Sequence, residues 1–423
     1  MPRRRAVEFA ALLGLSMATL GEPLPATAAG VPLVWHVESG DGKVLDSHEP
    51  DSPVNPASVV KLATSLRALE TLGVDHRFVT TVGTAGARPS GSSGEVTDIV
   101  IEGGADPDFH FENAVLLART LEEAGVRRAS GDLYVGSSFW LGWERGTVGR
   151  DTNDERRRED MGRRLLHAWS PRGWNQDERE SWKKMAGKRG WNASKPPAIQ
   201  IDGKIRTAAP PKWEPVVVHR SQPLLVALRR FNVFSNNDIE RLDASVGAPS
   251  TMPDFFESRW GREGASTSFS TSSGLNRNRM TPRQIVRLVR DLRAWLAGRG
   301  RDLGDVMPIL GCGESTLPHL FRRFAQTGEA NGLVGKTGTL NIQDGGVSAL
   351  AGYLPVGPGL VFFVAAPRAG QNLGPARAAT EDWARRVLLS RGTVQPPVCP
   401  PPVPTSDEFA QASRTGAPTT PGG

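Results

Sequence analysis

The stretch PASVVKLATSLRALETLG, residues 56–73, places one serine and one lysine three positions apart at the start of an apolar helix pattern. The apolar residues that recur at three- and four-residue steps are Val59, Leu62, Leu66, Leu69 and Leu72. The pattern predicts an amphipathic helix that ends at Gly73. Because residues i and i+3 lie on the same side of a helix, the amine of Lys61 can reach the hydroxyl of Ser58. A nucleophile with its base is one interpretation, and a capping serine beside a solvated lysine is the other.

The length and the N-terminus indicate an exported protein of more than one domain. The chain has 423 residues, of which 38% are hydrophobic and 23% are charged, as in globular proteins of two or three domains. Residues 1–29 combine three arginines, an apolar run over residues 9–20 and the small residues Ala26, Thr27 and Ala28. We expect a secretory signal peptide there, with an uncleaved anchor or a misassigned start as the alternative.

The net charge of +6 suits an acidic polymer. Nucleic acid would be the first guess for a cytosolic protein, but export shifts the expected partner to the anionic cell envelope. We therefore expect a periplasmic or extracellular location, a peripheral association with the envelope and no nucleic-acid partner. Cys312 and Cys399 are too few for a disulfide framework and lack the spacing of a metal site, so we interpret both as structural or incidental.

The last third of the chain is typical of antiparallel strands closed by a helix. Strand-like runs occupy residues 332–341, 345–355 and 359–367, and a helical pattern follows at residues 375–390. Residues 140–194 are dense in Arg, Glu, Lys and Trp and give no clear assignment. The Pro-, Thr- and Gly-rich tail, residues 392–423, is predicted to be disordered.

A second group of candidate residues is Lys336, Thr337 and Gly338, on the predicted strand 332–341. A cation and a hydroxyl can bind a substrate carboxylate, and the missing side chain of Gly338 lets a substrate backbone approach the strand. A polar edge strand with a turn glycine is the alternative. Between the two motifs, the polar loop STSSGLNRNRMTP places Asn278 just ahead of a helix, where it can overhang a cleft.

In this order the motifs resemble those of the class C low-molecular-mass penicillin-binding proteins, the D-alanyl-D-alanine carboxypeptidase/endopeptidase family. The resemblance covers about residues 31–391. Its further marks are EGGADPDF, SNNDIE, and GKTGTL followed by SALAGYL. It implies an α+β fold, with a transpeptidase or serine β-lactamase-like domain whose antiparallel sheet is flanked by helices. Residues 30–78 and 218–391 would form that domain, and residues 79–217 would form the inserted domain or domains.

The resemblance also implies the reaction. The protein would be a serine D-Ala-D-Ala carboxypeptidase/endopeptidase that acts on peptidoglycan stem peptides through an acyl-enzyme, with β-lactams as covalent inhibitors and no metal or cofactor. Ser58 would attack and Lys61 would act as the base. A lysine can do so only where burial or a neighbouring cation such as Lys336 favours its neutral form.

The remaining roles are carried over residue by residue. The expected catalytic residues are Ser58, Lys61, Asn278 and Lys336, and the expected substrate-binding residues are Asn276, Thr337, Gly338 and Thr339. The backbone N–H groups of Ser58 and Thr339 would hold the oxyanion. Lys336 and Thr337 would hold the terminal carboxylate, and Asn278 would bind the substrate amide. Asp106 and Asn237 are interpreted as structural residues.

One position departs from the family pattern. The Ser-x-Asn motif of the family would here read Asn-Arg-Asn, with Asn276 in place of the serine. This predicts weak peptide turnover, because an amide does not exchange a proton as a hydroxyl can. It keeps open a catalytically impaired penicillin-binding relative that serves as a cell-wall-binding protein. A related esterase or β-lactamase is a third reading, which the inserted domains disfavour.

Overall fold

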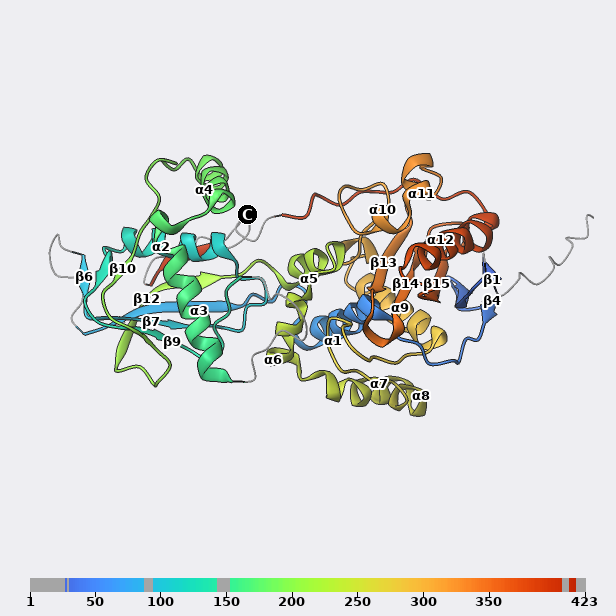
Figure 1. The fold of residues 1–423 in the computed structure, drawn as a ribbon, viewed down its shortest axis with the longest axis horizontal. Coiled ribbons are helices and arrows are strands. Elements are labelled where there is room, and N and C mark those ends of the chain that lie inside the picture. The colour runs from blue at the N-terminus through green and yellow to red at the C-terminus, as the bar shows by residue number, and fades with distance from the viewer. Residues whose placement is uncertain (1–26, 29, 87–93, 143–152, 405–410, 416–423) are drawn as a thin grey trace, which may run out of the picture.

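The computed structural model describes residues 27–28, 30–86, 94–142, 153–404 and 411–415, which form two lobes (Figure 1). The strands are β1 Thr27–Ala28, β2 Val31–Pro32, β3 Val34–Ser39, β4 Val44–His48, β5 Val79–Ala85, β6 Glu95–Val96, β7 Asp98–Glu102, β8 Arg128–Ala129, β9 Leu133–Val135, β10 Gln200–Ile201, β11 Ile205–Arg206, β12 Trp213–Arg220, β13 Val334–Leu340, β14 Val347–Leu354, β15 Leu360–Pro367 and β16 Gln411–Arg414. The α-helices are α1 Lys61–Leu72, α2 Phe111–Glu123, α3 Asp154–Ala168, α4 Gln176–Arg189, α5 Leu224–Val233, α6 Asp243–Val246, α7 Met252–Trp260, α8 Arg262–Ala265, α9 Pro282–Ala297, α10 Leu317–Leu320, α11 Arg322–Thr327 and α12 Gly374–Trp383. Shorter helical turns are η1 Ala57–Val60, η2 Pro171–Gly173, η3 Asn237–Leu242, η4 Pro249–Thr251, η5 Leu303–Asp305, η6 Gln343–Gly345, η7 Ala384–Leu388 and η8 Leu389–Arg391.

The first lobe is built around an antiparallel sheet with the strand order β13-β14-β15-β3-β4. Its strands come from both ends of the chain, so segments far apart in sequence lie side by side (Figure 1). The predicted strands 332–341, 345–355 and 359–367 are confirmed as β13, β14 and β15. Strand β13 is an edge of this sheet, which leaves half of its backbone groups facing away from β14.

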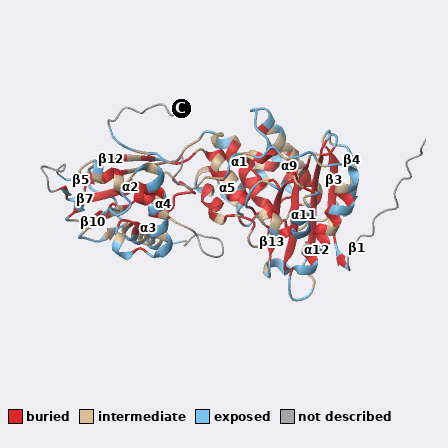
Figure 2. Ribbon diagram, turned by 90° about the horizontal axis from the view of Figure 1, so that it is seen from above, coloured by how far each residue is buried: buried red, intermediate tan, exposed pale blue. Residues whose placement is uncertain are grey.

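Alternating side chains of β15 pack into two separate hydrophobic cores, one on each face of the sheet. Phe363 packs with helices α1, α5 and α9 on one face of the sheet, and Phe362 packs with α12 on the other. This follows from the period-2 geometry of a strand, and a strand covered on both faces is apolar throughout. Buried residues accordingly fill the interior of the sheet and the inward faces of its helices (Figure 2). The α+β fold expected from the sequence is confirmed.

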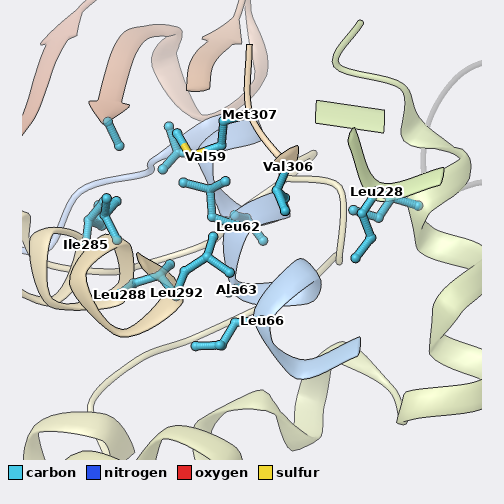
Figure 3. Packing of buried hydrophobic residues seen from close by; sticks show 14 of the residues in the cluster. Val59, Leu62, Ala63, Leu66, Leu228, Ile285, Leu288, Leu292, Val306 and Met307 are labelled. Carbon is cyan, nitrogen blue, oxygen red and sulfur yellow. The ribbon is translucent and has the colours of Figure 1, made fainter. Parts of the chain in front are cut away.

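The helix predicted from the opening motif begins with one turn of 3₁₀-helix, η1, and continues as α1. Leu62 and Leu66 of α1 pack beside Leu288 and Leu292 of α9 in the core of the first lobe (Figure 3). The helix ends where predicted, because Gly73 adopts a φ of 85°, which glycine reaches without steric cost.

The second lobe lies between β5, which begins at Val79, and β12, which ends at Arg220. Its larger sheet has the order β11-β9-β7-β5-β12-β16, and a smaller parallel sheet has the order β10-β8-β6. The stretch that gave no assignment holds α3 and α4, whose first turns are capped by Asn153 and Asn175. The apolar periodicity is weak there because both helices bury only a few residues and leave the rest partly or fully exposed.

The tail contradicts its predicted disorder in the parts that are described. Cys399 forms a disulfide with Cys312, with their Cα atoms 5.4 Å apart. Farther on, β16 adds to the edge of the second lobe's sheet by pairing with β12. A tail of this composition cannot form a hydrophobic core of its own. It can still be ordered by the disulfide and by the pairing of β16 with β12, because neither attachment needs such a core. The disulfide is consistent with an extracytoplasmic location. Among the described residues, no helix is long and apolar enough to cross a membrane, and the predicted signal peptide, apart from residues 27–28, lies outside them.

Candidate active site

The amine of Lys61 lies at the centre of a cluster of polar atoms. It is 3.0 Å from the hydroxyl oxygen of Ser58, 3.0 Å from the side-chain oxygen of Asn237 and 2.6 Å from the backbone oxygen of Ser273. A neutral amine has two N–H donors and one lone pair. If the donors are used by Asn237 and Ser273, the lone pair is left to accept the proton of Ser58. The proximity of Ser58 and Lys61 expected from their spacing is thereby confirmed.

Burial makes that neutral form accessible. Lys61 is completely buried, and desolvation lowers the pKa of its amine to about 7, against a smaller opposing effect of the Glu240 charge. Glu240 also accepts a hydrogen bond from the hydroxyl of Ser273, whose backbone oxygen binds Lys61. A lysine with such a pKa is half neutral near pH 7, which is what a general base requires.

Lys336 is also completely buried, and it faces Ser235 across the site. Its amine donates to the Ser235 hydroxyl at 3.0 Å and to the backbone oxygen of Thr337 at 2.8 Å. Burial, together with the charge of Lys61, lowers the pKa of Lys336 well below its ordinary value. Ser235 itself has a φ of 54°, an uncommon value for a serine, which indicates backbone strain at this position.

Ser235 and Asn237 are therefore the Ser-x-Asn residues that meet the two lysines, and the sequence interpretation missed them. SNNDIE is used above only as a mark of the family, with Asn237 expected to be structural. The signal was available, because Ser235-Asn236-Asn237 has the expected spacing at the end of an apolar helix. Asp106, the other residue interpreted as structural, accepts a backbone hydrogen bond from Asp108 within a turn.

The structure does not bring Asn276 and Asn278 to the cavity at Ser58. Asn278 is fully buried, where its side chain accepts from the backbone N–H groups of Ser270 and Thr271 and donates to the backbone oxygen of Leu275. It shapes the loop that carries Ser273 to Lys61, and it does not line the cavity at Ser58. Asn276 has a φ of 59°, a conformation that asparagine tolerates better than serine, so its presence there has a backbone explanation.

Gly338 packs closely against the turn that carries Ser58. A Cβ atom at this position would lie 2.4 Å from the backbone oxygen of Pro56. The missing side chain therefore makes room for the turn that presents Ser58. Ala57, the residue before Ser58, has a φ of 49°, so the nucleophile follows a strained backbone position.

A cavity of about 200 Å³ opens beside the nucleophile. Its lining residues are Ser58, Ser235, Thr316, His319, Leu320, Thr337, Thr339 and Arg377. Two of the expected binding residues, Thr337 and Thr339, thus lie on the cavity wall through the edge strand β13. The cavity joins η1, β13, α10, α12 and the loop after α5, so no single stretch of sequence contains it.

The chain matches one family model and part of a curated relative. The model describes the D-Ala-D-Ala carboxypeptidase 3 (S13) family and matches residues 21–158 and 192–387. The residues between the two matches include most of α3 and all of α4. A D-alanyl-D-alanine carboxypeptidase of Actinomadura sp. (strain R39) is 37% identical over 121 residues, which are 29% of this chain and 22% of that relative. The match to the curated relative therefore spans less than a quarter of its length.

Solved structures resemble most of the chain. The predatory endopeptidase Bd3459 of Bdellovibrio bacteriovorus, in complex with immunity protein Bd3460, has a TM-score of 0.72 at 19% identity, covering 90% of this chain and 98% of that chain. A penicillin G acylated form of the same protein has a TM-score of 0.68 at 20% identity, with the same coverage. Penicillin binding protein 4 of Haemophilus influenzae has a TM-score of 0.58 at 15% identity, covering 85% of this chain and 97% of that chain. At these identities the likeness establishes a shared fold.

Proposed function

Because the chain belongs to the D-Ala-D-Ala carboxypeptidase 3 (S13) family, we propose that it is a serine-type D-alanyl-D-alanine carboxypeptidase/endopeptidase that acts on peptidoglycan stem peptides through an acyl-enzyme. The observation that carries the proposal is the amine of Lys61, 3.0 Å from the hydroxyl of Ser58 and with a pKa lowered to about 7. A serine is a weak nucleophile until a base takes its proton, and this lysine can take it.

In the first step the oxygen of Ser58 attacks the carbonyl carbon between two D-alanines while its proton moves to Lys61. Asn237 and the backbone oxygen of Ser273 hold the amine in place for this transfer. The negative charge that develops on the carbonyl oxygen requires donors. We assign these to the backbone N–H groups of Ser58 and Thr339, because both residues line the cavity.

In the second step the C–N bond breaks and the departing amine takes up a proton. Ser235 is suited to deliver it, because its hydroxyl lies 3.0 Å from the amine of Lys336 and lines the cavity. The lowered pKa of Lys336 allows this amine to share a proton with the hydroxyl. Water then hydrolyses the ester on Ser58 and restores the free enzyme. The hydroxyl of Ser58 would also be acylated by a β-lactam.

The alternative of a catalytically impaired cell-wall-binding relative rested on Asn276 in place of the motif serine. That argument loses its support, since the hydroxyl of Ser235 lies 3.0 Å from the amine of Lys336 and lines the cavity, whereas Asn276 does not line it. We therefore favour an active peptidase. The disulfide between Cys312 and Cys399 supports export to an oxidising compartment, in keeping with the predicted signal peptide. N-terminal sequencing of the envelope fraction, with an expected start near Ala29 or Gly30, tests the export.

The function is tested by incubating the protein with an N-acylated peptide ending in D-alanyl-D-alanine and measuring the D-alanine released. The wild-type protein is expected to release D-alanine, and Ser58→Ala is expected to release none above background. A matched control is Ser266→Ala, which changes an exposed serine away from the cavity. Equal release by the wild-type and Ser58→Ala proteins would overturn the proposal.

A further inference from the structure

The cavity beside Ser58 is lined by a cationic residue that has no role in the sequence-based expectations, Arg377 on α12. We infer that Arg377 binds the terminal carboxylate of the substrate peptide and thereby sets the preference for peptides with a free C-terminus. This inference rests on the proposed function and deepens it, because it assigns a specificity residue for that reaction.

The charged residue expected to bind the carboxylate is already engaged elsewhere. Lys336 is completely buried, and its amine donates to the hydroxyl of Ser235 and to the backbone oxygen of Thr337. It is not among the residues that line the cavity. An ammonium group has three N–H donors, so two are committed to the protein, and a neutral amine has none left over. Lys336 is therefore poorly placed to neutralise a substrate anion.

Threonines on the cavity wall supply hydrogen bonds without charge. The hydroxyl of Thr337 donates to the hydroxyl of Thr316, which also lines the cavity. The loop that bears Thr316 is held by a backbone hydrogen bond to Val233 at the end of α5. These hydroxyls can orient a carboxylate. They cannot offset the cost of taking its charge out of water, which requires an opposite charge or several strong donors.

Arg377 has the free charge that this site needs. Its side chain is half-buried, and among the described residues its guanidinium forms no ion pair or hydrogen bond. Other arginines around α12 are paired: Arg323 contacts Glu381 and Asp382, and Arg385 contacts Glu329. A guanidinium stays charged at every physiological pH and binds a carboxylate through two parallel hydrogen bonds. An anion entering this cavity would thus meet an unpaired cation.

A carboxylate at this position explains how the chain can discriminate between substrates. A peptide with a free terminal carboxylate gains a charge-assisted pair with Arg377, whereas the same peptide ending in an amide does not. Hydrogen bonds to charged groups contribute enough binding energy for a preference of about 10- to 100-fold. We expect the wild-type protein to favour the free acid by a ratio of kcat/KM values in this range.

The test compares an N-acylated L-lysyl-D-alanyl-D-alanine peptide as the free acid and as its C-terminal amide, with cleavage followed by mass spectrometry. Arg377→Ala is expected to lower kcat/KM for the free acid by about 10- to 100-fold and to leave the amide within about twofold. Arg377→Lys, which keeps the charge but loses the two-pronged geometry, is expected to retain part of the preference. Arg386→Ala removes an equal charge from an exposed position off the cavity and should change neither rate.

The outcomes separate this inference from the function on which it rests. If Arg377→Ala slowed both peptides equally, or if the wild-type protein did not distinguish them, Arg377 would not be the carboxylate partner, while peptidase activity would stand. If the wild-type protein cleaved neither peptide, the proposed function would be contradicted and the assignment of Arg377 would go with it. Since folding defects slow both substrates together, the ratio of the two rates is insensitive to them.

Discussion

The side-chain oxygen of Asn237 lies 3.0 Å from the amine of Lys61, although 176 residues separate the two in the chain. Two positions earlier, the hydroxyl of Ser235 lies at the same distance from the amine of Lys336. One tripeptide therefore touches both buried lysines. The charge of Lys61 also helps to lower the pKa of Lys336, so the tripeptide lies between two amines of which one influences the protonation of the other.

Removing the side chain of Asn237, which accepts a hydrogen bond from the amine of Lys61, should slow acylation. We expect Asn237→Ala to reduce the rate of covalent labelling by a fluorescent penicillin by about 100-fold, because a misplaced base loses most of its advantage. Asn276→Ser is the matched control. It should change labelling and peptide cleavage by less than about twofold, since Asn276 does not line the cavity, although it should destabilise the fold slightly at its positive φ. A gain of peptidase activity in Asn276→Ser would show that position 276 takes part in the reaction after all.

Removing the hydroxyl of Ser235 should affect two substrates unequally. We expect Ser235→Ala to lower peptide cleavage by about 10² or more, since expelling an amine requires a proton. Acylation by penicillin should fall less, because opening a strained β-lactam ring needs less protonation of the leaving nitrogen. Stopped-flow labelling and peptide assays on the same preparation provide the comparison. Equal losses for the two substrates would assign the proton to another group.

The pH dependence of acylation should report the state of Lys61. The base must be neutral, so the rate should rise with pH through an acid limb centred near 7, the value to which burial lowers the pKa of Lys61. The rate of penicillin labelling is measured from about pH 5 to about pH 9, roughly two pH units on either side of this pKa. A rate independent of pH over this interval would argue against Lys61 as the base.

The charge of Glu240 should influence the pH at which this acid limb of the rate profile is centred. Its negative charge raises the pKa of Lys61, opposing the larger effect of burial. Glu240→Gln keeps an acceptor for Ser273 and removes the charge, so the acid limb should move to lower pH. Glu257→Gln, an exposed charge on α7, is the control and should leave the limb in place. A limb that moves upward in Glu240→Gln would contradict the assignment.

The disulfide between Cys312 and Cys399 should stabilise the first lobe. It closes a long loop, and the two residues are separated by 87 positions. The double variant with Cys312→Ser and Cys399→Ser should lose about 2–5 kcal/mol of unfolding free energy, observed as a lower midpoint of thermal unfolding. Cys312 lies four positions before Thr316, so we also expect weaker activity. Two free thiols in the native protein, titrated without reductant, would show that the bond does not form.

Local patterns predicted those parts of the site that are local. The pairing of Ser58 with Lys61 depends only on helix geometry, and the strand that carries Lys336 to Thr339 is marked by its alternation and by flanking turns. The fold class followed from the resemblance and from the order of these elements. The helix expected just after Asn278 is α9, which Thr281 caps.

Long-range contacts account for what the sequence did not reveal. Two loops each offered a polar Asn-containing motif, and only Ser235-Asn236-Asn237 begins with the expected serine. Which asparagine meets Lys61 and which one shapes the loop at Ser273 is decided by contacts between segments far apart in the chain. Arg377 escaped notice because it joins the cavity from a helix near the C-terminal end of the first lobe. The disulfide between Cys312 and Cys399 was not predicted, because the composition of a segment indicates whether it can form a core of its own. Composition does not indicate whether a disulfide will attach the segment to another part of the chain.

The most direct test of the central claim is mass mapping of the adduct that forms with benzylpenicillin. The account predicts a single covalent adduct on Ser58 in the wild-type protein, much slower formation in Lys61→Ala and no adduct in Ser58→Ala. An adduct of equal yield in Ser58→Ala, or one that maps to another serine in the wild-type protein, would contradict the assignment of Ser58 as the nucleophile.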